Sequence, residues 1–201
     1  MARFMAAATD AAHFPAPSLP EVAFLGRSNV GKSSVINCLL EAKLAHTSST
    51  PGRTRSINFF EVRWPGKPRP EVIFADLPGY GYAKLSREIS AEWPKFIEPY
   101  LNERPTLALC LALVDVNVPP QQSDRQLLDF LNNSGRNFLV IGTKSDRLSN
   151  NQLRNALKTL TDTYPTAPVI PFSAKTGAGR DQVWKSIRQS ADEFSTVLSQ
   201  S

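Results

Sequence analysis

A chain of 201 residues, 41% of them apolar, is long enough for one ordinary hydrophobic core and too apolar for a disordered protein. Its formal net charge of +5 favours polyanionic partners without requiring one. No apolar run approaches the ~18 residues of a membrane-spanning helix, so membrane insertion is not expected. Cys38 and Cys110 are too far apart in the sequence to suggest a disulfide or metal pair, which favours a reducing compartment and hence the cytoplasm.

The first 20 residues are rich in alanine and proline and contain no recognisable motif. They carry one arginine and no continuous apolar segment, unlike a secretory signal, and Asp10 is unlike an amphipathic import sequence. We expect a flexible N-terminal extension over residues 1–20, one domain over 21–195 and a C-terminal tail over 196–201.

After this extension, strand-like and helix-like segments alternate. Strands are predicted at 21–26, 56–63, 71–76, 107–115, 137–144 and 167–174. Helices are predicted at 32–43, 86–102, 121–132, 150–163 and within 177–194, with prolines 94 and 99 interrupting the second. The run 107–115 is apolar without alternation, which is typical of a strand covered on both faces. The turn 64–70 joins its flanking strands as an antiparallel hairpin.

This alternation predicts an α/β fold. We expect a mostly parallel central sheet with one antiparallel edge strand, helices on both faces, and a ligand site at the carboxyl ends of the strands.

The segment GRSNVGKS at 26–33 matches the phosphate-binding pattern G-x-x-x-x-G-K-[ST] between a predicted strand and a predicted helix. Gly26 and Gly31 allow backbone N–H groups and the helix N-terminus to face a β-phosphate. We expect Lys32 to reach the β- and γ-phosphates and the Ser33 hydroxyl to bind Mg²⁺. The pattern predicts a nucleoside triphosphate and leaves its base open. Asn29 either reaches toward the phosphates or a second cation, or only adopts an unusual backbone conformation.

Asp76 ends the predicted strand 71–76, where a carboxylate can hold Mg²⁺ through a water. Gly79 follows and can offer its N–H to the γ-phosphate. Position 80, where many such proteins carry a water-orienting glutamine, is a tyrosine. Tyr80 and Tyr82 either stack on RNA bases or pack the loop onto the following helix. Since no side chain is an evident general base, slow intrinsic hydrolysis is expected.

The segment TKSD at 143–146 closes another apolar strand. The Asp146 carboxylate can accept hydrogen bonds from N1–H and the 2-amino group of guanine, whereas adenine has neither donor. Lys144 can lay its aliphatic stem along the purine, and the Ala174 N–H can face guanine O6. GTP is therefore favoured, and an ATP-using enzyme is the alternative that needs adenine to fit against Asp146.

The loop 46–55 contains Thr47, Thr50 and Thr54, any of which can complete a magnesium shell. Its scarcity of apolar anchors is typical of a segment that orders with the γ-phosphate. These residues alone do not choose among the three threonines.

In their order and spacing, GRSNVGKSS, TPGRT, DLPGYGYAK, TKSD and FSAKTG resemble the EngB (YihA/YsxC-like) family of bacterial GTP-binding proteins, within the TrmE-Era-EngA-EngB-Septin-like class of P-loop GTPases. The resemblance covers residues 20–195. It implies a Ras-like fold, binding of GTP and GDP with Mg²⁺, a role in assembly of the large ribosomal subunit, and a part in cell division and septation.

The resemblance also implies site residues. The expected magnesium ligands are Ser33, Thr54 and Asp76, and the expected catalytic residues are Lys32, Asn29 and Thr54. Asn29, without a glutamine at position 80, resembles the asparagine of GTPases that recruit K⁺ to neutralise developing charge. The expected nucleotide contacts are Gly26, Arg27, Ser28, Asn29, Val30, Gly31, Lys32, Ser33, Ser34, Gly52, Arg53, Thr54, Asp76, Leu77, Pro78, Gly79, Thr143, Lys144, Ser145, Asp146, Phe172, Ser173 and Ala174.

Five basic residues lie within 17 positions against one acid, Glu61; they are Arg53, Arg55, Arg63, Lys67 and Arg69. Beside a nucleotide-sensing loop, this charge predicts a GTP-gated contact with ribosomal RNA, and an ordinary solvated surface accounts for it nearly as well.

We therefore expect a monomeric cytoplasmic GTPase whose partners are GTP, GDP and the large ribosomal subunit or its RNA. The alternative is a non-catalytic, GTP-gated module that binds ribosomal RNA and whose hydrolysis depends on a partner.

Overall fold

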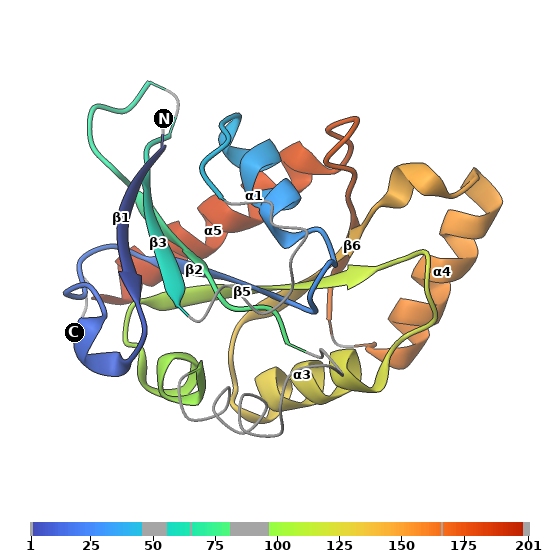
Figure 1. Ribbon diagram of the computed structural model, residues 1–201, viewed down its shortest axis with the longest axis horizontal. Helices are drawn as coiled ribbons and strands as arrows, with labels where there is room; N and C mark the ends of the chain where they lie inside the picture. The colour runs from blue at the N-terminus through green and yellow to red at the C-terminus, as the bar shows by residue number, and fades with distance from the viewer. Residues whose placement is uncertain (1, 46–55, 65, 81–96, 166, 199–201) are drawn as a thin grey trace.

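The computed structural model describes residues 2–45, 56–64, 66–80, 97–165 and 167–198 (Figure 1). The strands are β1 (Ala2–Ala8), β2 (Glu21–Gly26), β3 (Ile57–Val62), β4 (Val72–Asp76), β5 (Leu107–Asp115), β6 (Phe138–Thr143) and β7 (Val169–Pro171). The helices are α1 (Lys32–Leu40), α3 (Gln122–Asn133), α4 (Asn150–Thr163) and α5 (Arg180–Leu198). Residues 97–103 are also helical, and short 3₁₀ turns occur at η1 (Ala11–His13) and η2 (Ser145–Arg147).

The strands form a single mixed sheet in the order β1-β3-β4-β2-β5-β6-β7. β3 is antiparallel to both neighbours, while the remaining pairs, from β4–β2 to β6–β7, are parallel. The predicted α/β class with a mostly parallel sheet is confirmed. The antiparallel strand expected at the edge lies second from it, because β1 covers its outer side.

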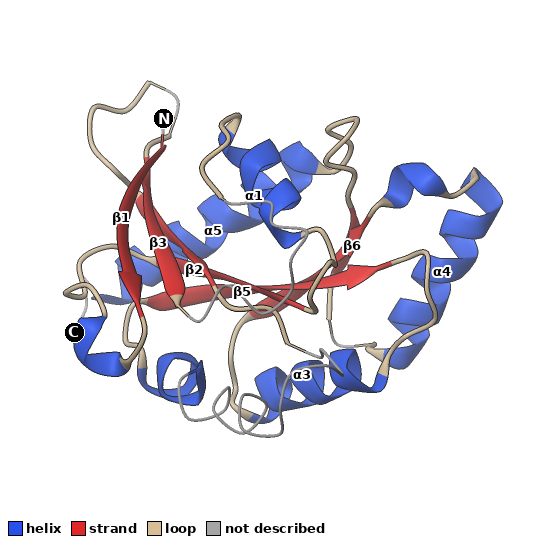
Figure 2. Ribbon diagram, viewed as in Figure 1, coloured by secondary structure: helices blue, strands red, loops and turns tan. Residues whose placement is uncertain are grey.

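Helices cover both faces of the sheet (Figure 2). On β2, Val22 and Phe24 point toward α1 and α5, while Ala23 and Leu25 point toward the helical residues 97–103 and α3. This alternation follows from the two-residue period of a strand. β5 is buried along its whole length, which explains its continuous apolar sequence.

β1 is the main departure from the predicted fold. The expectation of a flexible extension is wrong for residues 2–8, which pair antiparallel with β3 from Ala2 opposite Val62 to Ala8 opposite Ile57. The Phe4 ring packs edge-on against Phe60, with 5.8 Å between ring centroids. An alanine-rich segment has weak strand propensity, so its structure depends on pairing with the hairpin. The domain boundary at residue 21 stays a prediction.

A buried polar network lies at the amino end of the parallel strands. Glu21 is fully buried and accepts hydrogen bonds from the Tyr100 hydroxyl at 2.8 Å, Arg104 Nε at 2.8 Å and the Thr106 hydroxyl at 2.7 Å. Arg104 also donates to the carbonyl oxygen of Pro15 at 2.7 Å. The network therefore attaches the N-terminal segment to the end of the 97–103 helix.

Most other predicted elements appear within a few residues of their expected bounds, although β7 is shorter than the predicted strand 167–174. The first part of the predicted helix 86–102 and the whole loop 46–55 lie outside the described residues. Across the described ranges, no helix combines the length and the apolar character needed to cross a bilayer.

Candidate nucleotide-binding site

The predicted phosphate loop connects β2 to α1. A Cβ at Gly26 would lie 2.7 Å from Val30 Cγ1, so this close turn requires glycine. Gly31 is the N-cap of α1 with φ +101°, and Asn29 has φ +65°. Asparagine tolerates this left-handed conformation better than most residues. The loop thus leads into a helix N-terminus, whose unpaired N–H groups and dipole favour a phosphate.

Asp76 lies beside this loop because β4 pairs with β2, with Phe24 opposite Asp76. Its carboxylate is almost fully buried and forms an ion pair with Lys32 Nζ, although the two residues are 44 positions apart. A buried carboxylate without a cation is costly. The Lys32 ammonium supplies that cation in the ligand-free site, and it is the residue predicted to turn to the phosphates.

The donor set near Asp76 fits Mg²⁺. This ion takes few protein oxygens and keeps waters and phosphate oxygens in its octahedral shell. Ser33 and Asp76 supply a hydroxyl and a carboxylate next to the phosphate loop. In the part of the chain that the structure describes, no cluster of three or more His, Cys, Asp or Glu side chains occurs.

The turn after Asp76 packs directly on the phosphate loop. The Ser28 N–H donates to the carbonyl oxygen of Tyr80 at 3.0 Å. A Cβ on Gly79 would come within 3.1 Å of Ser28 N and Oγ, so a larger residue would press on the phosphate loop. The two predicted phosphate-sensing segments are therefore in contact.

Thr143 connects the segment predicted to read the base to the phosphate loop. Its buried hydroxyl lies 2.7 Å from the carbonyl oxygen of Val30 and 3.2 Å from that of Val114. Farther along, the Ser173 hydroxyl donates to Asp146 Oδ1 at 2.7 Å and accepts from the backbone N–H groups of Lys175 and Thr176. The Ser173 hydrogen bond holds the pKa of Asp146 below its ordinary value, so this carboxylate is ionised at neutral pH.

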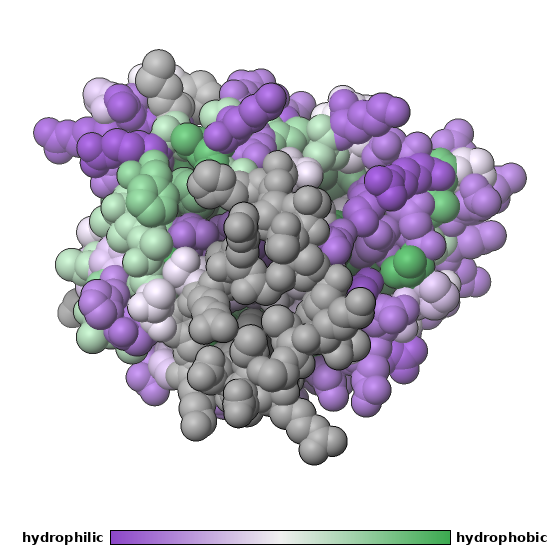
Figure 3. Space-filling model, viewed as in Figure 1, coloured by the Kyte–Doolittle hydropathy of each residue, from purple (hydrophilic) through white to green (hydrophobic). Residues whose placement is uncertain are grey.

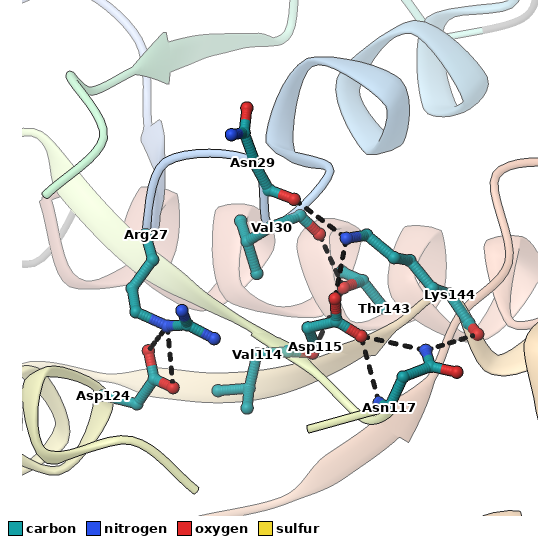
Figure 4. A network of polar contacts seen from close by, with 9 residues as sticks. All are labelled: Arg27, Asn29, Val30, Val114, Asp115, Asn117, Asp124, Thr143 and Lys144. Carbon is teal, nitrogen blue, oxygen red and sulfur yellow. Dashed lines mark hydrogen bonds and ion pairs between the residues drawn. The ribbon is translucent and has the colours of Figure 1, made fainter. Parts of the chain in front are cut away.

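Lys144 is the centre of the polar network in Figure 4. Its ammonium donates to Asp115 Oδ2 at 2.6 Å and to the carbonyl oxygen of Asn29 at 2.9 Å. Asn117 donates to the other Asp115 oxygen from its backbone N–H at 3.0 Å and its side chain at 2.9 Å. Burial raises the pKa of Asp115, but the hydrogen bonds from Lys144 and Asn117 outweigh it and the net pKa is lowered.

A cavity of about 1140 Å³ lies between the start of α1, the TKSD segment and the SAK segment, and Lys32, Ser33 and Asp76 are not among the residues that line it. Ligand clefts usually have about 300–1,000 Å³, so a nucleotide has ample room. The predicted residues that line it come from the phosphate loop, TKSD and SAK; they are Gly31, Ser34, Thr143, Lys144, Asp146 and Ala174. Three motifs far apart in sequence therefore meet at one cavity.

Other predicted contacts are placed differently. Six have buried side chains or, for glycine, a buried backbone, so any nucleotide contact would use backbone atoms: Gly26, Val30, Leu77, Pro78, Ser145 and Phe172. Asn29 is exposed, and Ser33 is half-buried. Gly52, Arg53 and Thr54 lie outside the described residues, and with them the choice of threonine.

Tyr80 packs on α3. Its ring contacts the apolar cluster on that face of the sheet, and its hydroxyl donates to Asp124 Oδ1 at 3.3 Å. Arg27 Nε donates to both Asp124 oxygens, at 3.0 and 3.1 Å. We call these residues the Arg27–Asp124–Tyr80 cluster. Tyr80 packs on α3 where the following helix was predicted, while its stacking on RNA bases stays a prediction; Tyr82 lies outside the described residues.

Burial governs the ionisation of this cluster. It raises the pKa of Asp124 above its ordinary value in spite of Arg27. Burial and the nearby Asp124 charge raise the pKa of Tyr80 well above its ordinary range. Tyr80 is therefore a neutral phenol and cannot serve as a base.

Several residues at this edge of the sheet were not predicted. Asp115 ends β5 as Asp76 ends β4, and this shared position was the signal that could have found it. Asp124 carries no such signal, because an acid in the first turn of a helix is common. Glu41 and Arg180 form an ion pair that bridges α1 and α5 beside the cavity.

Comparisons with known proteins agree with this geometry. Residues 21–144 match the model of a family described as 50S ribosome-binding GTPase. A probable GTP-binding protein EngB of Koribacter versatilis is 61% identical over 191 residues, or 95% of this chain and 94% of the relative. The chain belongs to the EngB family of GTP-binding proteins. A second EngB relative, from Acidobacterium capsulatum, is 56% identical over 199 residues, covering 98% of this chain and 94% of that protein.

Solved structures share the fold. The crystal structure of a probable GTP-binding protein EngB matches with a TM-score of 0.67 at 23% identity, over 86% of this chain and 99% of that one. Era in complex with MgGDPNP and a segment of 16S ribosomal RNA matches with a TM-score of 0.71 at 24% identity, over 86% of this chain and 56% of that one. These likenesses confirm the predicted Ras-like GTPase fold.

Membership of the EngB family resolves the choice of nucleotide. It establishes GTP as the nucleotide, so the ATP-using alternative is set aside. It also supports GTP hydrolysis as the general activity.

Proposed function

We propose that this EngB-family chain is a GTP-driven switch in the assembly of the large ribosomal subunit, and that it converts GTP and water to GDP and phosphate slowly on its own. The observation that carries the proposal is the convergence of Lys32, Asp76, Lys144 and Asp146 on one edge of the sheet, beside a position 80 that lacks a water-orienting amide. The description of the matching family as 50S ribosome-binding supports the choice of partner.

In this proposal the phosphate loop binds the nucleotide through its backbone N–H groups. The Lys32 ammonium exchanges Asp76 for β- and γ-phosphate oxygens and stabilises the charge that develops on them. Ser33 and Asp76, with Thr54 as the predicted third ligand, would hold Mg²⁺. When bound, this ion neutralises phosphate charge.

Guanine selection rests on Asp146. The Ser173 hydroxyl orients one carboxylate oxygen and keeps the group ionised, so that it can accept from N1–H and the 2-amino group. An adenine would leave this carboxylate without donors. Competition for labelled GTP tests the assignment: ATP should compete far more weakly than GDP, and equal competition would refute it.

The slow intrinsic rate follows from Tyr80, whose hydroxyl is bonded to Asp124 and whose ring is packed on α3. The missing charge stabilisation then comes from a K⁺ ion near Asn29, from a ribosomal partner, or from both. The Asn29 carbonyl is held by Lys144 while its side chain is exposed. Hydrolysis rates in matched K⁺ and Na⁺ buffers test the cation. Equal rates would show that K⁺ does not assist hydrolysis. Fast turnover without K⁺ or a ribosomal partner would refute the proposal of a slow switch.

The second candidate is a GTP-gated ribosomal RNA-binding module whose hydrolysis depends entirely on a partner. The same placement of Tyr80 favours it. Co-sedimentation with large ribosomal subunits, using GDP and a non-hydrolysable GTP analogue, tests ribosome binding in both cases. Turnover measured with and without subunits then separates them, because only the first candidate hydrolyses GTP alone.

At the level of the cell, we propose that the chain acts as a cytoplasmic monomer and that its family's role in cell division and septation follows from ribosome supply. Timed depletion tests this order of events. Incomplete large subunits should accumulate before septation fails, and the reverse order would support a direct role in division.

A further inference from the structure

The turn between β3 and β4 carries a concentrated positive charge. Arg63, Lys67 and Arg69 are exposed, and residues 63–70 contain no acid. Glu61 at the end of β3 is already paired with Arg3 at 2.8 Å. Figure 3 shows hydrophilic residues gathered at the upper left, where this turn extends in Figure 1.

The turn is fixed to α5 by aromatic packing. The Trp64 ring meets Trp184 edge-on with 5.4 Å between centroids, and the Arg188 guanidinium lies 5.6 Å from the Trp64 centroid. The Lys67 N–H donates to the Trp64 carbonyl at 3.1 Å. Arg188 thereby joins the three turn residues, and we call Arg63, Lys67, Arg69 and Arg188 the hairpin cluster. The acids next to it in sequence, Glu71 and Asp192, offset at most half of its four charges.

The hairpin cluster lies at the other end of β4 from the nucleotide site. Val62 pairs with Val72 at the turn, whereas Asn58 pairs with Asp76 at the phosphate loop. Four residue steps of strand separate the two ends by about 13 Å. Because the turn is anchored on α5, its conformation does not depend on the contacts that Lys32 or Gly79 make. The sequence predicts a nucleotide-gated contact for the basic stretch from Arg53 to Arg69. Its hairpin residues, Arg63, Lys67 and Arg69, lie too far from the nucleotide site to take part in the gating.

We propose that the hairpin cluster binds the phosphodiester backbone of ribosomal RNA equally in the GTP and GDP states. This inference rests on the proposed function and assigns the nucleotide-independent share of ribosome affinity to this surface. Spaced arginine and lysine side chains neutralise phosphates without reading sequence. An anionic membrane is the poorer partner, because Trp64, the only aromatic residue of the turn, is packed on α5 and not free to insert.

The test measures binding to large ribosomal subunits over a salt series, with GDP and with a non-hydrolysable GTP analogue. The variant is Lys67→Glu with Arg69→Glu. The matched control is Arg154→Glu with Lys158→Glu, which changes net charge equally at two exposed positions of α4. Losing two phosphate contacts should reduce the slope of log affinity against log salt by about 1.5. The ratio of affinities in the two nucleotide states should not change, nor should GTP affinity without RNA.

An equal effect of both pairs would overturn the proposal, since only net charge would then matter. A changed ratio between nucleotide states would overturn it as well, because the hairpin would belong to the gate. The proposal would also be overturned if the hairpin variant weakened binding to phosphatidylglycerol vesicles and not to large ribosomal subunits. If the wild type binds subunits in neither state, the proposed function fails, and the same series on protein-free large-subunit RNA decides the hairpin: hairpin-dependent binding supports its role, and its absence refutes it.

Discussion

The Arg27–Asp124–Tyr80 cluster predicts how firmly the phosphate loop is held. In Asp124→Ala, Arg27 Nε loses acceptors at 3.0 and 3.1 Å and the Tyr80 hydroxyl loses one at 3.3 Å. Removing one partner of a buried ion pair costs about 3–5 kcal/mol. The Arg27 side chain keeps 23% of its exposure, so water recovers part of its hydration. We therefore expect unfolding free energy to fall by about 2–3 kcal/mol, below the range for a fully buried pair.

Urea denaturation of the nucleotide-free protein measures this loss, with Tyr80→Phe as the matched control. The Tyr80 hydrogen bond is long for a hydroxyl donating to a carboxylate, so its removal should cost only about 0.5 kcal/mol. Because Arg27 belongs to the phosphate loop, Asp124→Ala should also raise KM for GTP more than it lowers kcat. Tyr80→Phe should leave kcat unchanged, since its hydroxyl faces α3.

Two results would refute this reasoning. If Asp124→Ala kept the stability and the GTP affinity of the wild type, the cluster would not support the phosphate loop. A fall in kcat of about tenfold or more in Tyr80→Phe would mean that the hydroxyl acts on the attacking water.

Four further predictions concern single residues. Glu21→Ala should lower unfolding free energy by about 3–5 kcal/mol in urea, because Arg104 and Tyr100 lose a buried acceptor, whereas Glu61→Ala at an exposed pair should cost under about 1 kcal/mol. Asp146→Asn should weaken GTP binding by about 1–3 kcal/mol in calorimetry without improving ATP binding, and a gain for ATP would contradict the pocket. Asp76→Asn should shrink the difference in GDP affinity between Mg²⁺ and EDTA buffers, and an unchanged difference would remove Asp76 from the metal site. The pKa of Asp115 is lowered, so its pairing with Lys144 stabilises the fold at pH values above the unfolded pKa of about 3.9, and this stabilisation is lost as pH falls through the folded pKa. Asp115→Asn should therefore flatten the acid limb of the curve of unfolding free energy against pH.

Much of the site could be predicted because parallel strands end at a common edge. Gly26, Asp76 and Thr143 each end an apolar run in the sequence, and β2, β4 and β6 bring these ends together. Each run can be found locally, and the fold rule then supplies the long-range contact. Lys32 and Asp76 are an ion pair for this reason, despite their separation of 44 residues.

What escaped prediction depends on contacts with no local signal. Residues 2–8 are alanine-rich, and they form a strand only because they pair with the outer edge of β3. Asp124 is 97 positions from Arg27 and looks like any acid in the first turn of a helix. The sequence shows that position 80 is a tyrosine and not a glutamine, but its packing on α3 could be predicted only by knowing which helix lies beneath the turn.

The two ion pairs at the strand ends differ in what a bound nucleotide asks of them. In the proposed function Asp76 and Lys32 must separate, because the lysine would move to the phosphates and the carboxylate would hold the metal. Asp115 and Lys144 need not, because this lysine reaches the Asn29 carbonyl while it stays on Asp115. Lys144 therefore ties the base-reading segment to the phosphate loop before any ligand arrives, so that end of the cavity is preorganised. The cost of rearrangement would fall on the Asp76–Lys32 pair, which lies at the start of the turn that contains Gly79 and Tyr80. In the proposed function, nucleotide binding would therefore perturb the segment that a switch needs to move and leave the Lys144 contacts in place.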